Sequence, residues 1–314
     1  MAGEAVAIST GAAMPRGANA IVPLEDAGGA NGVVEVVAET QAGSFVRRSG
    51  DDVSADEKVL MPGTTIGAAE LGVLASIGFR NVDCTARPRV SLVISGDELV
   101  GPGAALAPGQ IHDSNGIMLG ALAGQTGAEL VASERVPDDL SEIRRALKAA
   151  LRGDLVVVSG GVSVGEHDHV KHALSELGVR ELFWGVALRP GKPTWFGVAP
   201  DGALVFGLPG NPVSATVCFA LLVRPALLSM QGADPDRPRA TAILDTDYPK
   251  RRGRAHAVRC TLELRDNGWH ARPTRPEQAS HVLTSMLGAD ALALIPAESG
   301  DVTAGRRVEI ELLS

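Results

Sequence analysis

The sequence predicts an α/β protein with a three-layer, mostly parallel α/β core domain, a small C-terminal β-barrel domain and an incomplete β-rich region at the N-terminus. Three observations predict this fold class. Over residues 87–232, short apolar runs alternate with helix-forming segments, as in a parallel sheet with helices on both faces. Beyond a proline- and charge-rich linker at 231–240, apolar and polar residues alternate with a period of two. Before residue 87 the segments are short, glycine-rich and β-leaning.

The chain therefore divides into four expected parts. Residues 1–45 form a partial β-rich domain, and residues 46–86 form an elongated connecting domain with a short helix near 68–77. Residues 87–232 form the α/β domain, and residues 238–314 form the C-terminal β domain.

In the α/β domain, RVSLVIS at 89–95 and DLVVVSG at 154–160 are continuous apolar runs, which indicates strands covered on both faces. A helix is expected at 114–125 with Ser114 as its cap, and another at 138–152 with Asp138 or Asp139 as its N-cap. Asn211 and Pro212 are expected to cap and open a helix reaching about residue 230. The other elements expected in this domain are strands at 128–136, 180–188, 194–199 and 203–208 and a helix at 166–177.

The C-terminal domain is expected to contain only strands, without a long helix. Its period-two pattern fits a barrel or a sandwich, and a barrel is the expectation carried forward. The expected strands lie at 240–248, 256–265, 269–275, 291–297 and 306–313.

Composition narrows the classes of function. The 314 residues have a net charge of −8, which leaves no broad basic face and argues against a nucleic-acid partner. The three cysteines, Cys84, Cys218 and Cys260, are scattered and form no paired motif, which is typical of free thiols in a reducing compartment. No basic leader begins the chain, and VCFALLV is too short to span a bilayer. We expect a cytoplasmic protein with no membrane partner.

Chemistry-bearing residues follow the expected strands. In SGGVSVGEHDHV, which starts at Ser159, glycines that suit an anion directly precede Glu166 and Asp168, which would repel one. A bound metal ion reconciles the two, because it lets carboxylates and phosphates share a site. Three nearby histidines lack a fourth ligand at zinc spacing, so a zinc site is not favoured. The loop also lacks the lysine and spacing of a nucleotide-binding motif.

Two further loops contain features that suit anions. GLPGNPVS at 207–214 places free backbone N–H groups at a helix start, which suits a phosphate. RPGKP at 189–193 holds Arg189 and Lys192 between prolines and a glycine. Each loop alone is also typical of an ordinary turn, and the Asp pair in VPDDL is typical of a helix cap. Their joint occurrence in one domain favours a ligand site at the end of the sheet.

Taken in order, GDELV, GQIHDSN, SGGVSVGEHDHVK, RPGKP and GLPGNPVSA resemble the MoeA family of molybdopterin molybdenumtransferases, including the gephyrin E domain. ISTGAAMPRGANAIVPLED, FVRRSGDDV and ELGVLASIGF upstream, and GRAHAVR and the QASH segment downstream, are similar too. The resemblance covers nearly the whole chain. It implies a homodimer that inserts molybdate into adenylylated molybdopterin, releases AMP and requires a divalent cation, expected to be Mg²⁺.

The resemblance also implies roles for individual residues. The acidic catalytic positions match Asp52, Glu98, Asp138 and Asp168, of which Glu98, Asp138 and Asp168 would hold the metal. The substrate-binding positions match Thr10, Ser159, Gly160, Gly161, Ser163, Gly165, Pro209, Gly210, Asn211 and Pro212. The positions implied to bind molybdate are Arg189, Lys192, Ser214, Arg259 and Ser280. Cations with hydroxyl donors suit a dianionic oxyanion.

The chain departs from the family pattern at its start. Family members begin with a longer region that carries a Ser-x-Met-Asp-Gly-Tyr-Ala type motif, and this motif is absent here. We therefore expect an N-terminally truncated member that begins inside the family's second domain. Two alternatives remain open from the sequence: a molybdopterin adenylyltransferase, which shares the central fold, and a truncated, non-catalytic pterin-binding or scaffold paralogue. Other proteins of molybdenum cofactor biosynthesis are expected as partners.

Overall fold

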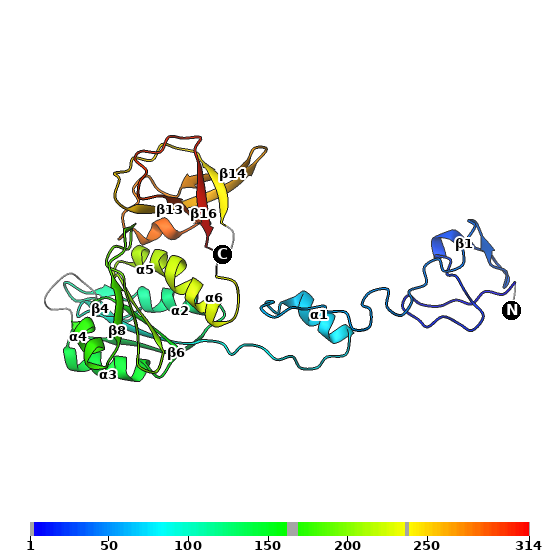
Figure 1. Cartoon of the computed structure of the whole chain (residues 1–314). Coiled ribbons are helices and arrows are strands. Elements are labelled where there is room, and N and C mark those ends of the chain that lie inside the picture. The colour runs from blue at the N-terminus through cyan, green and yellow to red at the C-terminus, as the bar shows by residue number, and fades with distance from the viewer. Residues whose placement is uncertain (1–2, 162–168, 236–238, 314) are drawn as a thin grey trace. The chain divides into compact units, whose positions relative to one another are not determined.

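The computed structural model describes residues 3–161, 169–235 and 239–313 (Figure 1). The chain separates into two compact units, residues 1–82 and residues 83–314, each of which is described by itself. The Ser163, Gly165 and Asp168 positions singled out in the sequence lie outside the described residues.

The first unit contains little regular structure among its described residues. Its elements are the 3-10 turn η1 (Leu24–Asp26), the short strand pair β1 (Ala27–Gly28) and β2 (Glu35–Val36), and the helix α1 (Ala68–Ser76). Glu70 starts α1 by accepting a hydrogen bond from the Gly67 backbone N–H at 2.9 Å. Leu74 is the one hydrophobic side chain buried in the described part of this unit. Its stability therefore depends little on a core of its own.

A six-stranded sheet forms the centre of the second unit. The strand order is β6 (Glu129–Val136), β3 (Arg89–Ser95), β7 (Leu155–Ser159), β11 (Leu204–Leu208), β10 (Trp195–Val198) and β8 (Arg180–Trp184). The first four strands are mutually parallel, and β10 is antiparallel to both of its neighbours. The side chains of β7 are all buried, which explains its unbroken apolar sequence.

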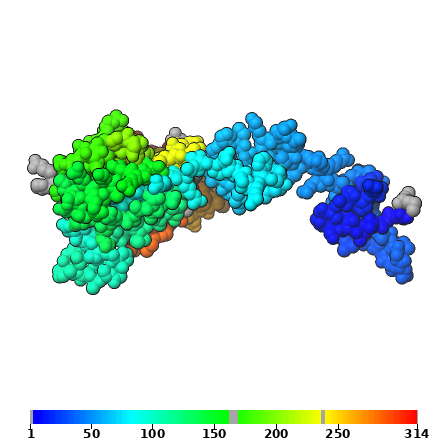
Figure 2. All heavy atoms as spheres, turned by 90° about the horizontal axis from the view of Figure 1, so that it is seen from below, coloured from blue at the N-terminus to red at the C-terminus, as the bar shows by residue number. Residues whose placement is uncertain are grey.

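Helices cover both faces of this sheet and complete the three layers expected from the sequence. On one face, Ile143 of α3 (Leu140–Ala150) and Leu174 of α4 (His169–Glu176) pack against Val156. On the other face, Leu119 of α2 (Asn115–Gln125) packs with Phe219 of the C-terminal helical run in the same core. In the space-filling view of one face, the green part of the chain, which includes α3 and α4, forms a continuous packed surface (Figure 2). The predicted α/β fold class is confirmed.

The helical run at 212–230 has three parts: α5 (Pro212–Cys218), a π-helical turn η2 (Phe219–Val223) and α6 (Arg224–Met230). By length and composition its 19 residues could cross a bilayer, but 56% of its most apolar 18-residue window is buried inside the domain. This burial is what a core helix of a folded domain shows.

The C-terminal domain is a closed five-stranded barrel. Its strands are β12 (Ala240–Leu244), β13 (Ala255–Arg265), β14 (Gly268–Pro273), β15 (Ala291–Ile295) and β16 (Arg307–Leu312). The order β14-β12-β16-β15-β13 closes because β13 also pairs with β14. The alternating inward side chains form a separate small core that includes Val258, Cys260 and Ile310. Closure resolves the choice between barrel and sandwich.

The α/β domain contributes one short strand to the barrel sheet. Residues 180–188 were expected to form one strand, but β8 ends at Trp184, and β9 (Leu188–Arg189) instead pairs with β13 of the barrel. The pairing is only two residues long, so no periodicity could reveal it. Val213 and Val217 of α5 also pack against Leu292 of the barrel, which lies directly above α5 in Figure 1.

Candidate functional site

The parallel strands of the sheet end in one row, and the candidate residues follow that row. Ser95 of β3 lies opposite Val136 of β6, and Ser159 of β7 lies opposite Leu208 of β11. The loops that follow these strands therefore leave the sheet at the same edge. This edge is where open α/β sheets bind ligands.

An acidic corner forms where β3 and β6 end. The Ser95 hydroxyl donates a hydrogen bond to Oδ1 of Asp138, and the Asp138 backbone N–H donates to Oδ1 of Asp97 at 3.0 Å. The Glu98 carboxylate folds back over Gly96, where a Cβ would lie 2.8 Å from Glu98 Oε2. Two predicted site carboxylates, Glu98 and Asp138, thus flank the end of one strand, and both are exposed to solvent.

The neighbouring Asp139 has a different role. Its carboxylate accepts hydrogen bonds from the backbone N–H groups of Ser141 at 2.9 Å and Glu142 at 3.1 Å, which makes it the N-cap of α3. The Ser141 hydroxyl also donates a hydrogen bond to this carboxylate. That bond is the largest cause, and the backbone bonds a further cause, of a lowered pKa of the Asp139 carboxyl. The structure therefore resolves which of the two aspartates caps the helix, and it leaves Asp138 to face the ligand edge.

A glycine turn follows β7. Gly160 and Gly161 have positive φ angles of 87° and 65°. A Cβ on Gly160 would lie 2.2 Å from the Ser95 carbonyl oxygen, and a Cβ on Gly161 would lie 2.6 Å from Val170 Cγ2. At Gly160 the turn therefore runs too close to the end of β3 for a side chain, and at Gly161 the positive φ and the Val170 side chain of α4 disfavour one.

Asn115 joins this turn to the GLPGNP loop, and sequence reasoning missed it. Its side-chain Nδ2 donates to Ser159 Oγ at 2.8 Å and to the Gly210 carbonyl oxygen at 2.8 Å. Its Oδ1 is buried without a hydrogen-bond partner among the described residues. The available signal was an asparagine at the end of GQIHDSN, immediately after the expected cap at Ser114. The Ser114 side chain makes no cap bond, so that predicted side-chain cap is wrong, and Asp113 instead accepts a hydrogen bond from the Gly116 N–H at 2.9 Å.

The GLPGNP loop also reaches the barrel domain. Asn211 precedes α5, but its side chain makes no cap bond, so the predicted side-chain cap is wrong. Its Nδ2 instead donates to the Ser280 hydroxyl at 3.1 Å. A substrate-binding candidate and a molybdate-binding candidate are thus in direct contact. Pro209 and Pro212 flank Asn211 in the same loop.

Arg259 holds the segment that carries Ser280. Its side chain is fully buried and donates from Nε to Ser285 Oγ at 3.1 Å, from Nη1 to the Gln278 carbonyl at 3.3 Å and from Nη2 to the Ala279 carbonyl at 3.1 Å. Because it binds the backbone on both sides of Ala279, Arg259 fixes the position of Ser280. Burial lowers the pKa of its guanidinium from the ordinary value.

The RPGKP loop is anchored on α5 by small side chains. Thr194 Oγ1 donates to the Gly191 carbonyl at 2.7 Å and contacts Cys218 Sγ at 3.1 Å. A Cβ on Gly191 would lie 2.4 Å from the same sulfur. The loop is therefore fixed while Arg189 and Lys192 remain exposed. Ser214, the remaining candidate for molybdate, is buried in the first turn of α5.

The predicted metal site is represented only in part. Glu98 and Asp138 lie at the acidic corner, and Asp168 is not among the described residues. Within ranges 3–161, 169–235 and 239–313, no three His, Cys, Asp or Glu side chains gather as metal ligands. Thr10 and Asp52 lie exposed in the first unit, which is described separately.

Three family models match successive parts of the chain. The model described as "MoeA N-terminal region (domain I and II)" matches residues 1–78. The model described as "Probable molybdopterin binding domain" matches residues 91–229, and the model described as "MoeA C-terminal region (domain IV)" matches residues 241–313.

Individual relatives agree with these models. The chain is 36% identical over 310 residues to molybdopterin molybdenumtransferase 2 of Mycobacterium tuberculosis. This alignment covers 96% of this chain and 76% of the relative. It is 34% identical over 312 residues to molybdopterin molybdenumtransferase of Haemophilus influenzae, covering 98% and 77%. The crystal structure of a molybdopterin biosynthesis MoeA protein from a Pyrococcus species superposes with a TM-score of 0.78 at 31% identity, covering 98% of this chain and 75% of that one.

Proposed function

This chain belongs to the MoeA family of molybdopterin molybdenumtransferases, and from that premise we propose that it inserts molybdate into adenylylated molybdopterin with release of AMP, a step of molybdenum cofactor biosynthesis. One observation in the structure favours this function above others. The acidic corner, the glycine turn and the GLPGNP loop meet at one edge of the sheet, and Ser280 of the barrel reaches the same loop.

The groups at this edge suit the two substrates. The glycine turn and the start of α5 present backbone to a pterin phosphate, with Asn115 holding the two loops together. Arg189, Lys192 and the hydroxyls of Ser214 and Ser280 suit a dianionic oxyanion, and Arg259 positions Ser280. Molybdate would thus be held on the barrel side of the same loops that hold the pterin.

We further propose that Glu98, Asp138 and Asp168 hold a Mg²⁺ ion. The two described carboxylates, Glu98 and Asp138, fit this ion, because hydrated Mg²⁺ is bound through one or two carboxylates and substrate phosphates, and Asp138 is oriented by the Ser95 hydroxyl. When bound, the cation neutralises phosphate charge. The chain's own contribution is to present two exposed carboxylates beside a glycine turn.

The proposed enzyme is a cytoplasmic homodimer. Residues 3–82 expose large apolar side chains, among them Leu24 at 87%, Val37 at 75% and Phe45 at 72%, and a second copy of the chain would cover them. Thr10 and Asp52 in this unit would then complete a cleft built from two subunits. Other proteins of molybdenum cofactor biosynthesis would deliver or receive the pterin.

Two adjacent aspartates allow a matched test of this function. With adenylylated molybdopterin and molybdate as substrates, we expect Asp138→Asn to reduce AMP release by about a hundredfold, because it removes a carboxylate of the acidic corner. Asp139→Asn should leave AMP release within about twofold of the wild type, since asparagine caps a helix about as well as aspartate.

Steady-state AMP release, with circular dichroism to confirm folding, measures both variants. Omitting molybdate shows whether the release depends on metal insertion. Wild-type levels of AMP release in the Asp138→Asn variant would contradict the proposed acidic site. AMP release that is unaffected by omitting molybdate would contradict the transferase function.

A further inference from the structure

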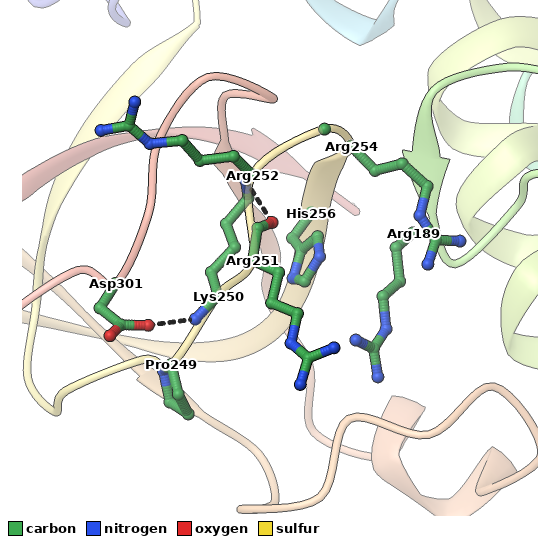
Figure 3. Close-up of a pocket in the computed structure, with 9 residues that line it drawn as sticks. Arg189, Pro249, Lys250, Arg251, Arg252, Arg254, His256 and Asp301 are labelled. Atoms are coloured by element: carbon green, nitrogen blue, oxygen red, sulfur yellow. Dashed lines mark hydrogen bonds between the residues drawn. The ribbon is translucent and has the colours of Figure 1, made fainter.

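A basic cavity of about 850 Å³ lies beside β9, on the barrel side of the RPGKP loop (Figure 3). Arg189 enters it from β9, and the other cations come from the loop that leads into β13. The lining residues are Arg189, Pro249, Lys250, Arg251, Arg252, Gly253, Arg254, His256 and Asp301. Four arginines and one lysine therefore line one cavity in a chain whose net charge is −8. The side chains of Arg189, Arg251 and Arg254 extend to the same side of the loop, whereas that of Arg252 extends away from them (Figure 3).

Most of this positive charge is not neutralised within the protein. The single carboxylate of the lining, Asp301, accepts the backbone N–H of Lys250 at 2.7 Å. The Lys250 ammonium donates to three backbone carbonyls, the nearest being that of Ser299 at 2.8 Å. Across the described parts of the chain, no carboxylate forms an ion pair with Arg251, Arg252 or Arg254. Like charges that face each other in a concave site attract anions.

The loop that carries these arginines is held in place by its backbone. The Gly253 N–H donates to the Ala297 carbonyl at 2.8 Å, and the Ala255 N–H donates to the Ala187 carbonyl at 2.8 Å. Together with the bond between Lys250 and Asp301, these contacts fix both ends of the loop. The guanidinium groups are therefore presented from a fixed backbone, which reduces the ordering cost of binding.

His256 reports the electrostatic character of the cavity. The imidazole is 5% exposed, and its Nδ1 lies 3.0 Å from the Tyr248 hydroxyl. Burial, and then the charges of Arg189, Lys250 and Arg254, lower the pKa of His256 to about 4. When the Tyr248 hydroxyl donates to Nδ1, the neutral ring carries its proton on Nε2 and offers a further donor.

We propose that this cavity is a second oxyanion site, in which Arg251 and Arg254 together with Arg189 bind a tetrahedral dianion. The forked donors of arginine match tetrahedral oxyanions better than the point charge of lysine does. In the reaction proposed above, on which this inference rests, the dianion is molybdate. Arg189 belongs both to the cavity and to the RPGKP loop, so an ion held here lies next to the proposed insertion site.

Molybdate binding tests the cavity directly, with sodium molybdate as the probe in isothermal titration calorimetry. Lys192→Gln/Ser280→Ala removes two candidates of the insertion site and leaves the cavity intact. In this background we expect molybdate to bind still. Adding Arg251→Gln/Arg254→Gln should weaken that binding at least about tenfold, or ~1.4 kcal/mol.

A matched control keeps the same change in net charge. Arg152→Gln/Arg180→Gln removes two exposed arginines of the α/β domain that lie outside the cavity, and it should leave the affinity within about twofold. Sodium sulfate should compete with molybdate more strongly than sodium chloride at equal ionic strength, because sulfate is also a tetrahedral dianion.

Three results would overturn the inference: no molybdate binding in the Lys192→Gln/Ser280→Ala background, equal weakening by the control pair, or equal competition by chloride. None of them bears on whether the wild-type chain releases AMP. Failure of the second site is therefore distinguishable from failure of the proposed function.

Discussion

At the scale of single residues, the protonation of His256 affects the stability of the folded protein. The ring is buried between the Tyr248 hydroxyl and the basic cavity. Its pKa falls from the ordinary 6.5 to about 4, with burial as the largest cause. The folded state therefore disfavours the imidazolium relative to the unfolded state.

This difference predicts a pH dependence with a definite sign. Above pH 6.5 the ring is neutral in both states, and its contribution to stability is complete. As the pH falls from 6.5 to 4, the unfolded state takes up a proton that the folded state does not, so stability is lost. The loss reaches about 3 kcal/mol at the lower pH.

Urea unfolding in chloride buffers at several pH values, for the wild type and His256→Gln, measures this loss. Oxyanion buffers are avoided because an anion in the cavity would offset the nearby arginines. The stability difference between the two proteins should shift by about 3 kcal/mol between pH 7 and pH 4. A difference that stays constant with pH would contradict the buried neutral ring.

Residue-scale prediction from sequence succeeded where a role depends on local sequence. Asp139 and Asp138 could both be proposed as caps, because each precedes a helix-forming segment. The bonds from Ser141 and Glu142 to Asp139 decide between them, whereas the role of Asp138 depends on Ser95, which is 43 positions away. Asn115 was missed for the same reason, since its partners Ser159 and Gly210 are distant in the chain. Arg259 was expected to contact molybdate, and its additional support of Ser280 became visible only in the fold.

At the scale of elements, the glycine turn after β7 places two parts of the site against each other. Gly160 combines a φ of 87° with a backbone oxygen 2.2 Å from where its Cβ would be. Gly202, in the turn between β10 and β11, has a φ of 94° and nothing within 4 Å of its Cβ position. Both glycines adopt a positive φ, which disfavours any side chain. Only Gly160 also lacks the space for a Cβ.

Alanine substitution at each position separates these two effects. Gly202→Ala should cost about 1–2 kcal/mol, because a side chain disfavours the left-handed conformation. Gly160→Ala should cost about 1–3 kcal/mol more, because the turn must also move away from the Ser95 carbonyl. Chemical denaturation of both variants measures the difference. Equal losses at the two positions would show that the turn is not closely packed against β3.

Element prediction worked well where hydrophobic pattern decides the structure. The continuous apolar runs of β3 and β7 and the alternating strands of the barrel appear where the pattern placed them. It failed for β9, whose two residues follow no period and pair with a strand more than 60 positions away. It also failed for the side-chain caps of α2 and α5, since neither Ser114 nor Asn211 makes a cap bond, and Asn211 has a competing partner in the barrel.

At the scale of the whole molecule, the two units differ in how much hydrophobic surface they bury. The second unit contains all of the large apolar clusters, whereas the described part of the first unit buries only Leu74. Exposed Leu24, Val37 and Phe45 in the first unit remain available to a second copy of the chain. The stability of the first unit should therefore depend on association.

Hydrogen exchange at two protein concentrations tests this dependence. Amides of residues 3–82 should exchange rapidly in dilute protein and more slowly as the concentration rises through the dimer dissociation constant. Amides of β3 and β13 should exchange slowly at both concentrations, because they lie in complete sheets. Identical exchange of residues 3–82 at both concentrations would contradict the proposed homodimer.

The strand β9 makes the α/β domain and the barrel inseparable as modules, although a linker joins them in the sequence. Cutting the chain between α6 and β12 would remove β9 from the barrel sheet. Ala255 and His256 of β13 would then lie on an open edge. Open edges recruit foreign strands, so an excised barrel should aggregate. Exchange of this barrel between relatives, by recombination or by engineering, would have to carry Leu188 and Arg189 along with it.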